Sequence, residues 1–209
     1  MIKLIFVAVL IFFMLWLSVN INRSYRKDRQ TKEAFLDRET QANATRKQSL
    51  DELDYITIPL DKLPFCNENN NDFSEYEDKI KLLSSKNIVN FTGMSNTDLK
   101  LEYGAANLNL LSEYDRNYTE LVRTLYLWGK VLYDNNKISE AKQVLEYAVS
   151  INCDISQIYF ILADIYVECH ETGSIYNLIK KANGLNSLLK NSIVNKLNEI
   201  LAQSGHTPE

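Results

Sequence analysis

The feature that most constrains this fold is a self-similarity at a spacing of 34 residues in the C-terminal half of the chain. Shifting the sequence by this spacing places apolar residues on apolar residues and small residues on small ones. The matched pairs are Leu125 with Tyr159, Trp128 with Leu162, Gly129 with Ala163, Leu132 with Tyr166, Ala141 with Ile175, Leu145 with Ile179 and Ala148 with Ala182. Such a period is typical of helical repeats, in which each hairpin buries its apolar face against the next.

Gly129 interrupts an otherwise good helical segment, LYLWGKVLYDNNKISEAKQVLEYAVS. A glycine inside a helix costs about 1 kcal/mol relative to alanine, so its place there needs a reason in the packing. Helices approach closely only where small side chains meet, and Ala163 is small at the matching position. We therefore expect a close helix–helix contact at Gly129, with turns at YDNNKIS (133–139) and CHETGS (169–174).

The motif Leu125-x₂-Trp128-Gly129-x₂-Leu132, followed by Ala141-x₃-Leu145, resembles the tetratricopeptide repeat (TPR). Two units, about residues 122–189, fit this register. The resemblance implies antiparallel helical hairpins whose first helices line a concave, peptide-binding face. The positions that it implies for this face are Arg123, Tyr126, Lys130, Tyr133, Gln157, Phe160, Asp164 and Glu168.

Two readings of this face stay open in the sequence. Its aromatic and charged side chains suit a peptide segment, but the tyrosines also suit packing against neighbouring helices or against the arm at 55–65. The carboxylate clamp of the family uses lysine and asparagine where Tyr126 and Lys130 stand here. The resemblance therefore does not imply recognition of chaperone tails.

Helices are also expected on both sides of the two units. Ser95 and Asp98 have the spacing of a capping box, which predicts a helix from Thr97 to Tyr114. At the other end, KNSIVNKLNEILAQ (190–203) has an apolar stripe and a polar opposite face, as a terminal capping helix should. The segment SNTDLKLEYGAANL (95–108) is in addition similar to uncharacterised membrane-anchored proteins of low-GC Gram-positive bacteria.

The N-terminus carries an apolar run from Ile2 to Ile21, which reaches the roughly 20 residues that a bilayer core requires. No A-x-A-like cleavage site follows it, so we expect a retained single-pass anchor rather than a signal peptide. Five basic residues follow the run, against Lys3 and the α-amine before it. They are Arg23, Arg26, Lys27, Arg29 and Lys32. This asymmetry predicts a cytoplasmic C-terminal side at the cell membrane, with the basic cluster near anionic lipid.

N-x-[ST] triplets, among them those at Asn43, Asn90 and Asn117, favour the opposite orientation if they are glycan acceptors. The chain is rich in asparagine, so we interpret these triplets as accidental.

The sequence thus predicts an all-α protein with one transmembrane helix, an extended arm and a short TPR-like array. Residues 1–22 are the expected anchor, 23–54 a charged helical spacer, 55–95 an extended arm with a short helix, 96–204 the repeat domain and 205–209 a disordered tail. Pro59 and Pro64 impose the extended path of the arm.

No residue pattern points to catalysis, a cofactor, a metal or a small-molecule substrate. The three cysteines are widely spaced, the two histidines (His170 and His206) lie far apart, and no metalloprotease, hydrolase or nucleotide-loop motif occurs. The net charge of −4 offers no basic field for nucleic acid. We expect a membrane-tethered adaptor or scaffold that binds a protein or peptide partner and is not an enzyme. The alternative is a structural subunit or assembly factor of a membrane or envelope complex, possibly extracytoplasmic.

Overall fold

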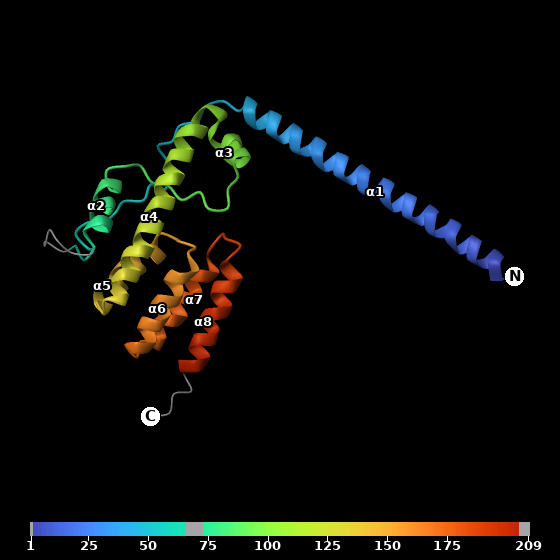
Figure 1. The fold of residues 1–209 in the computed structure, drawn as a ribbon. Coiled ribbons are helices and arrows are strands. Elements are labelled where there is room, and N and C mark those ends of the chain that lie inside the picture. Colours follow the sequence, from blue (N-terminus) through green and yellow to red (C-terminus); the bar gives the residue numbers. More distant parts are fainter. Residues whose placement is uncertain (1, 66–72, 205–209) are drawn as a thin grey trace. The chain divides into compact units, whose positions relative to one another are not determined.

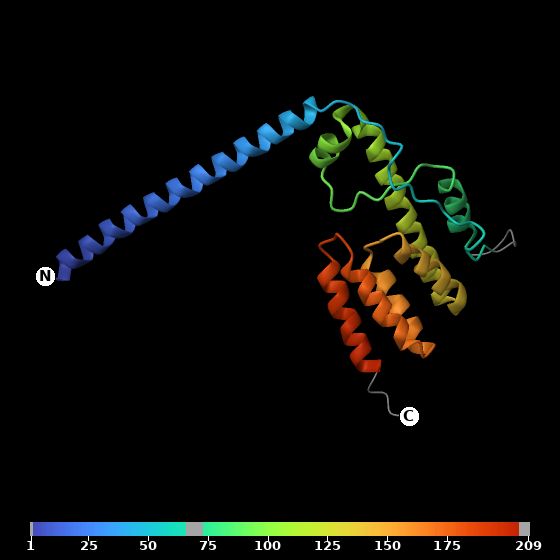
Figure 2. The ribbon, with the colours of Figure 1, turned by 180° about the vertical axis from the view of Figure 1, so that it is seen from behind.

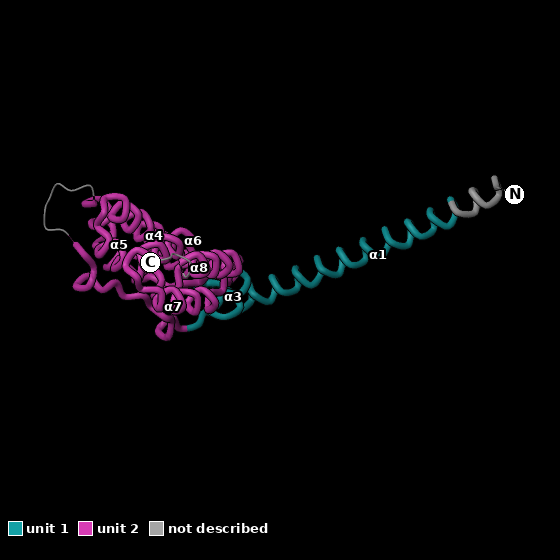
Figure 3. The backbone as a smooth tube through the Cα atoms, turned by 90° about the horizontal axis from the view of Figure 1, so that it is seen from below, with its two compact units in different colours: residues 1–48, 95–108 teal, residues 49–94, 109–209 magenta. Residues whose placement is uncertain are grey.

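The computed structural model describes residues 2–65 and 73–204; the side chains of residues 2–9 lie outside the description. Within these residues the chain is all-α, as predicted. The α-helices are α1 (Ile2–Ala44), α2 (Ser74–Leu83), α3 (Asn96–Tyr103), α4 (Leu108–Asp134), α5 (Ile138–Ser150), α6 (Ser156–Glu168), α7 (Thr172–Asn183) and α8 (Lys190–Ser204), with a 3₁₀ helix η1 at Ala105–Asn107. Two compact units are distinguished in Figure 3: Met1–Gln48 with Ser95–Leu108 form unit 1, and Ser49–Met94 with Asn109–Glu209 form unit 2.

Unit 2 is built around successive antiparallel helices. Figures 1 and 2 show α6, α7 and α8 side by side, with α5 next to α6. Helix α5 packs against α6, α6 against α7, and α8 against both α6 and α7. Ile193 and Leu197 of α8 are buried, whereas the neighbouring Asn195 and Lys196 are exposed. Helix α8 therefore ends the array with a polar outer face, as predicted.

The two hairpin turns repeat at the 34-residue spacing. In the first turn the Lys137 N–H donates to the Leu132 carbonyl, and in the second the Glu171 N–H donates to the Tyr166 carbonyl. Asn136 and His170, at matching positions between them, adopt left-handed backbone angles with φ of 59°. Both turns thus end a helix with the same Schellman-type cap.

Gly129 lies at a close approach of α4 and α5. A Cβ atom there would overlap the Leu145 side chain and lie 2.6 Å from its Cγ. Both residues are in the buried core of unit 2, with Trp128 and Leu145 wholly inaccessible. The predicted reason for this glycine is confirmed.

The arm at 55–65 and α2 pack against the first hairpin. Ile58, Leu63, Ile80 and Leu83 are all buried in the same core cluster as α4 and α5. The Phe65 ring lies 5.4 Å from that of Trp128, centroid to centroid. The Ile56 N–H donates to the Ile88 carbonyl, 2.9 Å away. These elements cover the side of the array opposite to α8, so both of its ends are closed.

The helix that we expected from Thr97 to Tyr114 is wrong in extent. Its start is correct, because Ser95 and Asp98 form the predicted capping box. It ends at Tyr103, however, because Gly104 adopts a φ of +90° that a right-handed helix cannot include. A new helix, α4, begins at Leu108 and runs to Asp134, well before the expected start of the first repeat.

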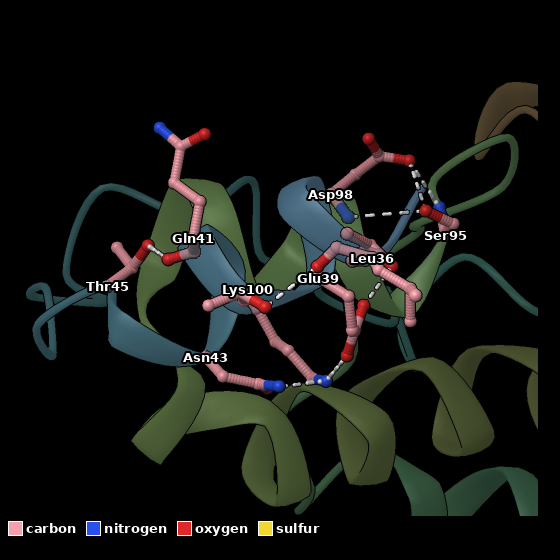
Figure 4. A network of polar contacts seen from close by, with 10 residues as sticks. Leu36, Glu39, Gln41, Asn43, Thr45, Ser95, Asp98 and Lys100 are labelled. Atoms are coloured by element: carbon pink, nitrogen blue, oxygen red, sulfur yellow. Dashed lines mark hydrogen bonds and ion pairs between the residues drawn. The ribbon is translucent and has the colours of Figure 1, made fainter. Parts of the chain in front are cut away.

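Unit 1 joins the C-terminal part of α1 to α3 through a polar network (Figure 4). The Lys100 ammonium forms an ion pair with Glu39 and donates to the Asn43 side-chain oxygen, 2.9 Å away. The Thr97 hydroxyl donates to the second Glu39 oxygen at 2.7 Å. Arg38 pairs with the capping-box carboxylate of Asp98 at 2.5 Å. Helix α3 is therefore fixed to α1 by charged side chains that are mostly near the surface.

The spacer helix ends at Ala44, earlier than the expected 54, because the next residues pass against Gly104. The Gln48 N–H donates to the Tyr103 carbonyl at 3.0 Å. The buried Asn107 side chain donates to the carbonyls of Gln48 and Tyr103, at 2.8 and 2.7 Å. A Cβ atom on Gly104 would lie 2.7 Å from the Lys47 Cα. This close passage holds the chain out of a helix.

Helix α1 is exposed over most of its described side chains. From Leu10 to Leu17 each side chain is apolar and between 41% and 72% exposed. Among the described residues, no helix has a stretch that is both long and apolar enough to cross a bilayer. The expected span at 2–21 begins with residues 2–9, whose side chains lie outside the description.

Candidate functional site

The predicted binding face is divided between helices α4 and α6. Arg123, Lys130, Gln157, Asp164 and Glu168 are exposed, and Tyr126, Tyr133 and Phe160 are half-buried and pack on the core. On α4, Tyr126, Lys130 and Tyr133 are spaced four and then three residues apart, which places them on one side of the helix. The face therefore combines half-buried aromatic rings with exposed charged side chains.

A hydrogen bond connects the two helices of this face. The Tyr133 hydroxyl of α4 donates to a Glu168 carboxylate oxygen of α6, 3.1 Å away. Burial raises the pKa of the Tyr133 phenol above its usual value, and the hydrogen bond to Glu168 raises it further. Tyr133 therefore remains protonated and able to donate throughout the physiological range.

The acidic side of the face is formed by Asp164 and Glu168, one helical turn apart on α6. Burial raises the pKa of Asp164, the negative charge of Glu168 acts in the same direction, and Lys196 of α8 opposes it. Lys196 itself pairs with Glu199 at 3.1 Å. Lys130, on the α4 side, pairs with Asp134 of its own helix at 2.5 Å. Lys130 and Lys196 are thus each paired with a carboxylate of their own helix.

The arm contacts a different side of α4. Its Phe65 ring lies against Trp128, which is two residues from both Tyr126 and Lys130 and so points roughly the opposite way. Farther back along the arm, the Tyr147 hydroxyl of α5 donates to the Thr57 carbonyl at 3.4 Å. These contacts anchor the arm on the Trp128 side of the hairpin rather than across the predicted face.

A hollow between α5, α6 and α7 was missed in the sequence. Its volume is 240 Å³, and its lining residues are Glu146, Val149, Leu162, Tyr166, Ser174, Asn177, Leu178 and Lys181. The Tyr166 hydroxyl donates to Glu146 at 2.7 Å, and Lys142 lies over the Tyr166 ring while it pairs with Glu171. Two polar residues of this lining, Glu146 and Tyr166, bond to each other, which favours a structural role for this pair.

No chemistry-bearing cluster emerges from the described residues. Among them, no group of histidine, cysteine, aspartate and glutamate side chains is arranged to hold a metal ion. Cys153 is buried, which raises the pKa of its thiol to about 12, and Cys169 is exposed. Cys66 and His206 lie outside the described residues.

The side-chain nitrogens of two of these N-x-[ST] asparagines, Asn90 and Asn117, donate hydrogen bonds within the fold. Asn117 is 6% exposed and its side-chain nitrogen donates to the Asn87 carbonyl at 2.9 Å. The Asn90 nitrogen donates to the Tyr118 hydroxyl at 2.9 Å. Because a glycan would replace a hydrogen of these same nitrogens, a glycan at Asn117 is incompatible with this packing.

Comparisons with known proteins add no relative: no family model, no curated protein and no solved structure matches this chain.

Proposed function

We propose that this chain is a membrane-tethered adaptor or scaffold of the TPR-like kind, which binds a protein segment on the α4–α6 face and carries it near the bilayer. The single observation that carries the proposal is the composition of this face. Half-buried aromatic rings lie beside exposed charges of both signs, a composition that is common at protein interfaces. Helix α8 covers one end of the helical array, and α2 with the arm covers the other. The charged residues of the α4–α6 face stay exposed and accessible to a partner.

The apolar run at the N-terminus supports the membrane part of the proposal. The side chains from Leu10 to Leu17 form a continuous exposed apolar band. Exposing an apolar surface of this kind to water is unfavourable, and such surfaces mark membrane or protein contacts. Asn20, near the end of the run, donates to the Trp16 carbonyl at 3.0 Å, so its amide is partly satisfied within the helix. The proposed orientation is cytoplasmic for the C-terminal side. The basic residues after the run support it, and the buried Asn117 weakens the argument from glycosylation.

The binding proposal is tested with the double variant Tyr126→Ala, Phe160→Ala. Proteins that co-purify with the full-length chain from native membranes should be lost from this variant at unchanged helix content. The matched control is Tyr176→Ala on α7, which removes an aromatic ring that is 63% exposed and lies outside the face. Equal co-purification with the double variant and with the natural chain would contradict the proposed face.

A second experiment separates an adaptor from a structural subunit of a membrane complex. Residues 4–19 are replaced by an unrelated apolar helix of the same length. A tether retains its activity after this exchange, because it needs only the bilayer, whereas a subunit whose span contacts other helices loses its complex. Fusion of compartment-specific reporters to the C-terminus tests the orientation: activity of an exported reporter would favour the extracytoplasmic assembly factor instead.

A further inference from the structure

The basic residues that follow the apolar run of α1 are not equivalent, because a continuous helix fixes their height and direction. Helix α1 continues without a break from Ile2 to Ala44. At 1.5 Å per residue, Arg23, Arg26 and Lys27 lie within about 9 Å of Ile21 along the axis, whereas Arg29 and Lys32 lie about 12 and 16 Å away. The Debye length is about 8 Å at physiological ionic strength, so only the first three lie within roughly one screening length of the end of the run.

The same three residues share one side of the helix. Arg26 and Lys27 follow Arg23 by three and four residues, the spacing of neighbours on a helical surface. Asp28 falls on a different side from Arg23. All three basic side chains are exposed.

The free charge of the two groups also differs. Arg29 donates to Glu33 at 2.9 Å, and this ion pair reduces its net charge. Within the described residues, Arg23, Arg26 and Lys27 form no ion pair of this kind. Among the same residues, Lys32 forms no such pair either, but it lies about 16 Å from Ile21 along the axis. The unpaired positive charge close to the apolar run therefore belongs to Arg23, Arg26 and Lys27.

We infer that Arg23, Arg26 and Lys27 form a basic face that binds the headgroups of anionic phospholipids, and that Arg29 and Lys32 do not contribute to it. This inference rests on the proposed membrane anchor. The occupant is a bilayer surface because the face continues directly from the exposed apolar band, which a soluble anion would leave uncovered. Each basic residue at such a surface favours anionic lipid by roughly fivefold, and more distant residues by much less.

The test uses the full-length chain in phosphatidylcholine vesicles that contain a minor share of phosphatidylglycerol. Bromine atoms, which quench tryptophan fluorescence on contact, are placed on the acyl chains of one lipid or the other at equal mole fraction. Trp16 in the apolar run is the reporter, and Trp128 is wholly buried and supplies a constant background. The measured quantity is the ratio of quenching by the anionic lipid to quenching by the zwitterionic lipid.

Two matched variants remove two charges each: Arg23→Gln with Lys27→Gln, and Arg29→Gln with Lys32→Gln. We expect a quenching ratio above one for the natural chain and for the distal variant, and a ratio close to one for the proximal variant. The ratio of the natural chain should also fall toward one in 1 M salt, where the Debye length is about 3 Å.

The failures are distinguishable. A ratio of one in the natural chain, with strong quenching by both lipids, overturns the lipid preference and leaves the anchor in place. An equal loss of preference in both variants overturns the division into a proximal face and a distal pair. An absence of quenching by either lipid overturns the membrane anchor and the inference with it.

Discussion

The helices of unit 2 are held together by apolar side chains, whereas α1 and α3 of unit 1 are joined largely by polar contacts. In unit 2, Leu145 of α5 fills the space left by Gly129 of α4, and Trp128 next to it is wholly buried. In unit 1, two ion pairs join α3 to α1: Lys100 with Glu39, and Asp98 with Arg38. Apolar burial depends little on charge screening and on pH, while surface ion pairs are screened by salt and lost when their carboxylates are protonated. The two units should therefore respond differently to the same perturbation.

The largest effect is expected for Trp128→Ala in unit 2. Removing a fully buried indole that contacts Phe65 should cost about 3–5 kcal/mol of unfolding free energy, measured by denaturant titration. Trp128→Phe is the control. It keeps an aromatic ring and removes an indole N–H that has no hydrogen-bond partner among the described residues, so it should cost much less. Equal losses for both variants would contradict the packing account.

In unit 1, Gly104→Ala should separate the chain after α1 from α3. Alanine is strained at a φ of +90°, and its Cβ would meet the backbone at Lys47. We expect a local cost of about 1–3 kcal/mol. Amide hydrogen exchange should show faster exchange in α3 and no change in α6. Uniformly faster exchange in both helices would show that the two units do not respond separately.

Two helical glycines of unit 2 should respond with opposite signs. Gly129→Ala introduces a Cβ that overlaps Leu145, and overpacking of this kind costs about 1–3 kcal/mol, of which helix propensity recovers about 1. At Gly173 no atom of the described residues lies within 4 Å of an added Cβ, apart from its chain neighbours and the nearby backbone of its own helix. Gly173→Ala should therefore stabilise the fold by about 0.5–1 kcal/mol. Thermal unfolding of both variants measures the difference. Stabilisation by Gly129→Ala would disprove the close approach.

The smallest effect is the acid response of unit 1. The hydrogen bond from Lys100 lowers the pKa of Glu39, and the capping contacts of Ser95 lower that of Asp98. A lowered pKa in the folded state means that both carboxylates stabilise unit 1 above their ordinary pKa values, near pH 4. Their contribution is lost as the pH falls from there through the lower folded values. The NMR methyl signals of Leu99 in α3 should therefore shift between pH 5 and pH 3, while those of Leu162 in α6 stay constant. A shift of Leu162 ahead of Leu99 would reverse the comparison.

The sequence predicted the hairpins of unit 2 well because their determinants are local and periodic. The 34-residue match and the small residue at Gly129 each specify a contact within a short stretch, and in unit 1 the capping box at Ser95 specifies a helix start in the same local way. The break at Gly104 was missed because its cause is the passage of residues 46–47 against that glycine, a contact between segments far apart in the chain. The early start of α4 was visible in the helical spacing of Leu111, Tyr114, Tyr118 and Leu121, all of them buried.

The candidate face could be predicted only in part. Its positions followed from the resemblance to TPR repeats, and the structure brings Tyr133 and Glu168 into contact across two helices. The sequence left open whether the arm lies across it. That question depends on which side of α4 meets Phe65, and this is decided by tertiary packing against Trp128.

The central claim, a partner bound on the α4–α6 face, is tested most directly by photo-crosslinking in the membranes of cells that express the chain. A photoreactive amino acid is placed singly at Lys130 or Asp164 on the face, and at Asn177 or Asn195 as exposed controls on α7 and α8. We predict discrete crosslinked adducts from the two face positions and none from the controls. Adducts from the controls with none from the face would contradict the claim and move the interaction surface to the other side of the array.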